Sequence, residues 1–159
     1  AKRRLAELTD SGYEESTRQP ATTALAELGD KSYCDVMLQV MSLRQGYSSD
    51  IAARGAGLLC GERAIPQLVA LSSSPSMFPV YEVAYALGNT SSRNAVPALI
   101  ELLHTVDGEQ LRAVQEALYT LTHRRSSSGK SGADEYQEWT NWWAFEGKTA
   151  QIFDPSECP

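Results

Sequence analysis

The chain has 159 residues, of which 42% are hydrophobic and 21% are charged. This composition is ordinary for a globular domain that buries a core, and it excludes an intrinsically disordered chain. The 20 acidic residues outnumber the 14 Lys and Arg residues, which gives a net charge of −6. The acidic excess argues against binding to a nucleic-acid backbone without a local basic patch. No apolar run approaches the roughly 18 residues that a membrane span needs.

The three cysteines, Cys34, Cys60 and Cys158, are an odd number without C-x-x-C spacing. The pattern indicates neither a disulfide framework nor a zinc site. We interpret Cys34 and Cys60 as small buried residues of helices, and Cys158 as part of a Pro-flanked tail. Because the chain begins at Ala1 rather than Met, a removed leader and the compartment, cytoplasmic or exported, stay open.

The predicted elements are helices throughout. Pro20 suits the first turn of a helix, Gly29 its C-cap, Gly46 the end of the following helix, and Asp50 an N-cap. In chain order, the expected helices span residues 1–9, 20–28, 33–43, 50–60, 62–71, 77–87, 93–104, 108–122 and 134–145. No segment alternates with period two, so we expect no β-sheet.

A hydrophobic pattern recurs about every thirty residues. One anchor series is Ala21, Ile51, Val80 and Leu111, and a second, seven residues later, is Leu28, Leu58, Leu87 and Leu118. Both series advance by 30, 29 and 31 residues. A period of this size is typical of stacked helix pairs, because one pair alone cannot bury its apolar face.

The pattern predicts a single all-α domain over residues 1–159, built as a right-handed α-solenoid of about four helix pairs. Its expected parts are an N-terminal helix or partial repeat at 1–19, the repeats at 20–122, a flexible loop at 123–133, a capping helix at 134–146 and a tail at 147–159. The loop is expected because Ser and Gly dominate it.

Residues 86–118 resemble the HEAT repeats, specifically the short bacterial HEAT-like type also found in phycobilisome lyases. The matching motifs are Ala-Leu-Gly at residues 86–88, a short polar turn, and Ala-Val-Pro-Ala-Leu at 95–99. The resemblance extends over roughly residues 20–122. It implies a helical repeat fold and carries little information on function.

Two families of enzymes share the HEAT-like fold, and the residues of this chain fit neither of them. HEAT-like deoxyhypusine hydroxylases bind iron through His-Glu pairs, whereas His104 precedes Thr105 and His123 precedes Arg124. HEAT-like DNA glycosylases use a basic groove, whereas the only basic cluster here lies in the predicted loop. We therefore expect no enzymatic activity, no metal and no cofactor.

The C-terminal helix is rich in aromatic residues. Tyr136, Trp139 and Trp143 follow i, i+3, i+7 spacing, with Trp142 at the edge of the stripe. We predict that Trp139 and Trp143 seal the open end of the repeats, with the alternative that they form an aromatic binding shelf. Glu135, Glu138 and Asn141 are expected to face water.

We expect a protein-interaction or scaffold module that binds a peptide or partner protein on a concave face made by the second helix of each pair. The alternative is a bilin-lyase-related or chromophore-handling subunit. The predicted contact residues are Gln39, Arg63, Gln67, Arg93, Glu101, His104 and Trp142. Their mixed charge favours a protein over a nucleic acid, and the oligomeric state stays open.

Duplex DNA should bind weakly and without sequence preference, because the protein is acidic and its basic cluster is confined to one loop. A fluorescence anisotropy titration at physiological salt measures this. Micromolar or tighter affinity that disappears in an Arg124→Ala/Arg125→Ala variant would contradict the prediction.

Overall fold

The computed structural model describes residues 1–44, 46–73, 79–127 and 131–154, and these ranges contain helices but no strand. The helices are α1 (Lys2–Glu7), α2 (Glu15–Glu27), η1 (Lys31–Tyr33), α3 (Cys34–Ser42), α4 (Gly46–Cys60), η2 (Gly61–Ala64), α5 (Ile65–Ser72), α6 (Val80–Gly88), α7 (Ala95–Leu102), α8 (Gly108–Thr122), α9 (Gly132–Trp142) and the π-helical turn η3 (Trp143–Gly147). The expected all-α fold is therefore confirmed for the described residues. None of their helices has the length and apolar character to cross a bilayer.

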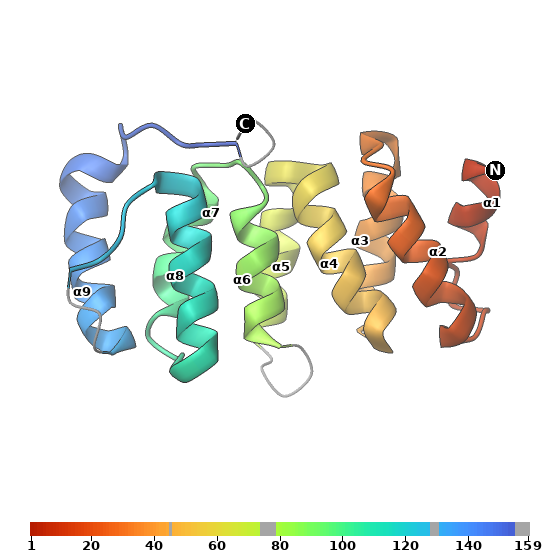
Figure 1. Cartoon of the computed structure of the whole chain (residues 1–159), viewed down its shortest axis with the longest axis horizontal. Helices are drawn as coiled ribbons and strands as arrows, with labels where there is room; N and C mark the ends of the chain where they lie inside the picture. Colours follow the sequence, from red (N-terminus) through yellow and green to blue (C-terminus); the bar gives the residue numbers. More distant parts are fainter. Residues whose placement is uncertain (45, 74–78, 128–130, 155–159) are drawn as a thin grey trace.

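The helices form two layers (Figure 1). α2, α4, α6 and α8 stand side by side in one layer, and α3, α5 and α7 lie behind them. Each helix of the second layer also contacts the first-layer helix of the next pair, as α3 does with α4 and α7 with α8. The hydrophobic core lies between the layers and runs without interruption from α2 to α9.

Small residues let neighbouring first-layer helices approach closely. A Cβ atom on Gly57 of α4 would lie 2.2 Å from the carbonyl oxygen of Ala86 in α6. A Cβ on Gly88 of α6 would lie 3.1 Å from Ala117 in α8. These contacts recur one repeat apart, so the same small-residue pairing sets the spacing of α4, α6 and α8.

The helix predicted at residues 20–28 begins earlier than Pro20 indicated. Helix α2 starts at Glu15, and Pro20 lies inside it. Proline removes one helical hydrogen bond there. The buried Arg18 compensates, because it binds Glu15 at 2.8 Å and the carbonyl oxygen of Tyr13 at 3.0 Å and so holds the first turn in place.

Asp50 is not the N-cap of the next helix, and Gly46 does not end the previous one. Helix α3 ends at Ser42, and α4 starts at Gly46. The carboxylate of Glu15, from α2, accepts hydrogen bonds from the backbone N–H of Ser48 at 2.7 Å and from its hydroxyl at 2.8 Å. A distant residue thus caps α4, which local sequence patterns cannot reveal.

Part of the second anchor series is exposed. Leu87 and Leu118 are buried as predicted, but Leu28 is 47% exposed and Leu58 is 48% exposed. The buried stripe of α4 includes Ala52, Ala56 and Leu59 instead. Leu58 and Leu59 point about 100° apart around the helix, and Leu59 rather than Leu58 faces the core.

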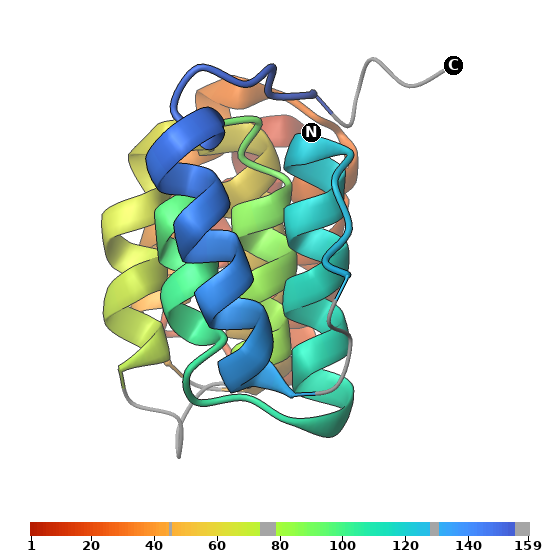
Figure 2. The same cartoon turned by 90° about the vertical axis from the view of Figure 1, so that its left-hand side faces the viewer.

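The end of the core beyond α8 is covered by α9, which Figure 2 shows in front of α7. Trp139 is 1% exposed and Trp142 is 9% exposed, and their rings meet edge to face at 5.3 Å. Helix α9 therefore packs tryptophan rings against the end of the core, and Trp142, rather than the predicted Trp143, is buried with Trp139. Trp143, the first residue of the π-helical turn η3, is only half-buried.

Two glutamates of α9 do not simply face water, contrary to the prediction. Glu135 is completely buried and accepts a hydrogen bond from Gln115 of α8 at 2.5 Å. Glu138 accepts hydrogen bonds from the backbone N–H and the hydroxyl of Ser127, both at 2.9 Å. Glu138 therefore attaches the described part of the predicted loop to α9. The loop residues 128–130 lie outside the described residues.

The first part of the predicted tail is packed rather than free. Residues 148–154, here called the C-terminal strap, run back along the ends of the helices (Figure 1). Arg93 donates hydrogen bonds to the carbonyl oxygens of Gly147 at 2.8 Å and Lys148 at 2.9 Å. Phe153 stacks on His123 with 3.6 Å between ring centroids. The predicted helix start at Met77 and the tail residue Cys158 lie outside the described residues.

The interpretation of Cys34 and Cys60 as unlinked residues is wrong. They form a disulfide between the start of α3 and the end of α4, with Cα atoms 4.9 Å apart. The odd number of cysteines and the spacing of 26 residues concealed this pair. Only the stacking of α4 on α3 brings the two Cα atoms within bonding range.

Truncation of the buried tryptophans should strongly destabilise the protein. Trp139→Ala should lower the free energy of unfolding by about 3 to 5 kcal/mol, and Trp142→Ala should cost more than Trp143→Ala. Urea unfolding of the three variants measures the order. Phe145→Ala is the control, because Phe145 is 86% exposed and should change stability by less than about 0.5 kcal/mol. Equal stability of Trp139→Ala and the parent would contradict the cap.

Reduction of the disulfide should also lower stability. Closing a loop of 26 residues restricts the unfolded chain by about 3.5 kcal/mol in the chain-entropy description. Urea unfolding with and without dithiothreitol tests this. The Cys34→Ser/Cys60→Ser variant should match the reduced protein and should not respond to the reductant. An unchanged midpoint on reduction of the parent protein would show that the bridge is absent.

Candidate functional site

The predicted contact residues near the N-terminal end of the second layer lie close together. Gln39 of α3 and Arg63 of η2 are exposed. Arg63 forms an ion pair with Asp35 at 2.7 Å, and Gln67 of α5 donates a hydrogen bond to the carbonyl oxygen of Leu38 at 3.0 Å. Arg63 and Gln67 therefore link η2 and α5 to α3, and part of their polar capacity is used inside the protein.

Glu101 of α7 and His104, just after this helix, form a second group with α9. The hydroxyl of Tyr136 donates a hydrogen bond to Glu101 at 3.3 Å, and the rings of Tyr136 and His104 lie 3.5 Å apart. Both predicted residues are exposed, so a partner can reach them. The predicted set is thus divided between the α3–α5 region and the α7–α9 region.

The side chains of Arg93 and Trp142 make contacts within the protein itself. The guanidinium of Arg93 holds the C-terminal strap, as described above, and also donates a hydrogen bond to the carbonyl oxygen of Ala150 at 2.5 Å. Trp142 belongs to the cap and is 9% exposed. Neither side chain is presented to a partner in this conformation.

The first layer carries an aromatic surface that the sequence analysis did not select. Its members are large exposed side chains on the outer sides of α4 and α6. We call this surface the α4–α6 face, and it consists of Tyr47, Arg54, Leu58, Tyr81 and Tyr85. Tyr47 is 71% exposed and Tyr85 is 45% exposed. Helical spacing explains the alignment, because positions 47, 54 and 58 share one side of α4, and positions 81 and 85 share one side of α6.

An ion pair joins the two helices under this face. Arg54 of α4 binds both carboxylate oxygens of the buried Glu82 of α6. The nearby Asp50 is half-buried, and its burial, together with the negative charge of Glu82, raises the pKa of the Asp50 carboxyl above its usual value. Burial and the same two carboxylates also raise the pKa of Tyr81. The α4–α6 face therefore combines aromatic rings with a slightly negative centre.

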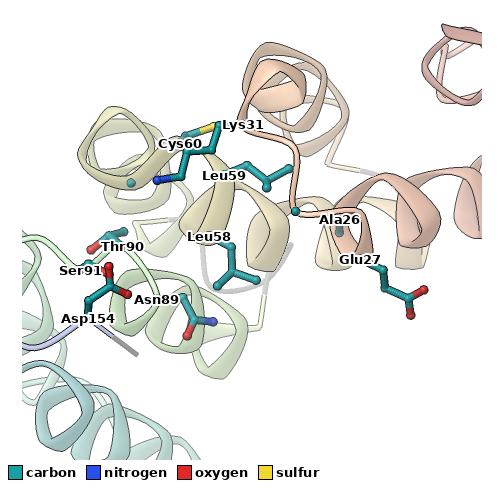
Figure 3. A pocket seen from close by; sticks show the side chains of 12 residues that line it. Ala26, Glu27, Lys31, Leu58, Leu59, Cys60, Asn89, Thr90, Ser91 and Asp154 are labelled. Carbon is teal, nitrogen blue, oxygen red and sulfur yellow. The ribbon is translucent and has the colours of Figure 1, made fainter. Parts of the chain in front are cut away.

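A pocket of about 540 Å³ opens at the end of this face, where the turns after α2, α4 and α6 meet the C-terminal strap. We call it the turn-edge pocket. Figure 3 shows Leu58 and Asn89 on one side, Lys31 beside Cys60, and Asp154 next to Ser91. Its volume falls within the range of ligand pockets. Because Leu58 belongs to both the α4–α6 face and the pocket, the two form a continuous surface.

One sequence signal could have located this surface. Tyr81 and Tyr85 stand four residues apart, so they share one side of a helix beside an apolar stripe. The thirty-residue period instead favoured Leu58 as a core anchor. A period identifies equivalent positions, but it does not say which of them faces the core.

The basic cluster of the loop is partly neutralised. Arg124 forms an ion pair with Glu138 at 3.3 Å, and Arg125 forms one with Glu116 at 3.0 Å. The guanidinium of Arg125 also lies 4.0 Å from the centroid of the Tyr119 ring. Among the described residues, no group of three His, Cys, Asp or Glu side chains is placed to hold a metal ion.

The comparison with protein families identifies one repeat. Residues 80–105 match the family model of the PBS lyase HEAT-like repeat. These residues form a HEAT-like repeat. The match begins at the first residue of α6 and ends just beyond α7, so this HEAT-like repeat corresponds to one helix pair of the structure. No curated protein and no solved structure matches the chain.

Asp50→Asn should stabilise the protein at neutral pH. The pKa of Asp50 is higher in the folded protein than in the unfolded chain. The ionised carboxylate is therefore less favourable in the folded protein, and the free energy of unfolding falls as the pH rises above the pKa that Asp50 has in the unfolded chain. The variant should therefore be more stable than the parent at pH 7, and the difference should shrink as the pH falls through the range in which Asp50 becomes protonated. Urea unfolding at pH 3, 5 and 7 measures this. A loss of stability at pH 7 would contradict the electrostatic analysis.

Proposed function

We propose that the chain is a non-enzymatic interaction module, a right-handed α-solenoid of about four HEAT-like helix pairs that binds a partner protein. The HEAT-like repeat at residues 80–105 supports the architecture. Stacked helix pairs bury their core between the layers and leave long outer faces for binding.

The observation that carries the proposal is the α4–α6 face with the turn-edge pocket at its end. Its exposed tyrosines and Leu58 provide the aromatic and apolar surface that is common in protein interfaces. Its cation, Arg54, is already bound by Glu82, so the face offers little attraction to a phosphate backbone. We infer that the partner docks its own apolar side chains here, with one of them in the turn-edge pocket.

The second layer is the alternative to the α4–α6 face as the surface that binds a partner protein. Gln39, Arg63 and Glu101 are exposed there and carry mixed charge. Unlike the residues of the α4–α6 face, they have no large exposed aromatic neighbour among the described residues. The nearby Tyr136 is half-buried. This surface therefore suits the rim of an interface better than its centre.

Site-specific photo-crosslinking in the organism that encodes the chain distinguishes the two surfaces. A photoreactive phenylalanine analogue at Tyr85 probes the α4–α6 face, one at Gln39 probes the second layer, and one at Phe145 is the control at the C-terminal end. We expect a discrete protein adduct from position 85, which Leu58→Asp should abolish. Because Leu58 is exposed, that variant should keep the melting temperature of the parent.

An adduct from position 39 alone would move the binding site to the second layer. Equal labelling from all three positions, or no protein adduct at any, would contradict the proposed function.

The alternative is a bilin-lyase-related or chromophore-handling role, which is supported by the description of the matching family. The turn-edge pocket, with a volume of about 540 Å³, is large enough to consider for a chromophore. We expect the absorbance of an added bilin to stay unchanged on mixing with the purified chain. A shifted band that Leu58→Asp removes would favour the alternative.

A further inference from the structure

A small cavity lies between α8 and α9, away from the α4–α6 face. Its volume is about 140 Å³, and it is lined by Gln115, Arg125, Ser126, Glu135 and Trp139. A water molecule occupies about 30 Å³ in the liquid. The cavity is therefore large enough for several waters or for one small organic group.

Two of its lining residues each have a buried polar atom without a hydrogen-bond partner among the described residues. One is Oε2 of Glu135, whose other oxygen is bound by Gln115, and the second is the indole Nε1–H of Trp139. Glu135 is fully buried and Trp139 is 1% exposed. A buried carboxylate without a full set of partners is costly, as is a buried N–H donor. Both costs fall if a ligand supplies a donor to Glu135 and an acceptor to Trp139.

The charges around the cavity favour a cationic donor. Arg125 stands at its rim, but its guanidinium is bound by Glu116 at 3.0 Å and lies over Tyr119. The three charged groups, Glu135, Glu116 and Arg125, together carry a net charge of −1. An ammonium group satisfies Glu135 best, because charge-assisted hydrogen bonds are about twice as strong as neutral ones.

We propose that this cavity binds an α-aminoacyl group, that is, a primary ammonium with a carbonyl oxygen beside it. The ammonium donates to Oε2 of Glu135, and the carbonyl oxygen accepts from Nε1 of Trp139. The volume of the cavity is large enough for one small amino-acid residue. A free amino acid derivative and the N-terminal residue of a peptide both present this chemistry.

Tryptophan signals report directly on the cavity. The chain has three tryptophans, all within residues 139–143, so its indole fluorescence and its three indole N–H resonances arise from α9 and the first residue of η3. Titration with glycinamide should shift the indole N–H resonance of Trp139 more than those of Trp142 and Trp143. N-acetylglycinamide, which lacks the ammonium, and ethylammonium, which lacks the carbonyl, should bind much more weakly.

An isosteric substitution of Glu135 and an aromatic substitution of Trp139 test the roles of the two side chains. Glu135→Gln should weaken glycinamide binding by about tenfold or more, and Trp139→Phe by about fivefold. Glu109→Gln, an exposed carboxylate of α8, is the matched control and should bind like the parent. Thermal unfolding without probe verifies that each variant is folded. The comparison of the three probes on the parent protein tests the proposal even if a variant fails to fold.

The two sources of the group are distinguished by triglycine and free glycine. Binding of triglycine with the affinity of glycinamide assigns the cavity to a peptide N-terminus, whereas binding of glycinamide and glycine without triglycine assigns it to a small molecule. Absence of binding by every probe would overturn the proposal and leave the cavity to water. Equal binding of glycinamide and its acetylated form, or unchanged affinity in Glu135→Gln, would overturn it too. Binding that appears only in Arg125→Met would show that Arg125 is the natural partner of Glu135.

Discussion

The spacing of the first-layer helices depends on the contacts of Gly57 with Ala86 and of Gly88 with Ala117. At Gly57 the neighbouring backbone is so close that any larger residue would push α4 and α6 apart. Helices that approach this closely bury little side-chain volume between their backbones, so the larger apolar residues point toward the second layer. The continuous core between the two layers follows from this arrangement.

The same close spacing explains why large residues accumulate on the outer surface. A helix in the first layer has its neighbours on two sides and the second layer on a third, which leaves one side for solvent. On α4 and α6 that side carries tyrosines and Leu58, although charged residues would serve solubility better. An exposed aromatic surface beside a pocket is the pattern expected of an interaction site rather than of a purely structural face.

The C-terminal part of the chain closes the array. Helix α9 covers the last pair with Trp139 and Trp142, and the C-terminal strap then returns along the turns, where Arg93 and His123 hold it. Arg93 lies in the HEAT-like repeat of residues 80–105, so this repeat also contacts the C-terminal strap. The strap also brings Asp154 to the turn-edge pocket. The proposed binding surface therefore includes residues from the start, middle and end of the described chain.

Local patterns in the sequence determined the helical class, the repeat period and most helix positions. Period 3.6 and the thirty-residue spacing are properties of short segments, so Leu87, Leu118 and Trp139 could be placed in the core in advance. Tertiary structure decided what depends on residues far apart in the chain. Glu15 caps α4, Cys34 meets Cys60, and Glu135 is buried against Gln115, because packing rather than local propensity brings these pairs together. The exposed position of Leu58 has the same origin: a repeat period fixes which positions are equivalent, but only the contact between α4 and α6 determines which of them faces solvent.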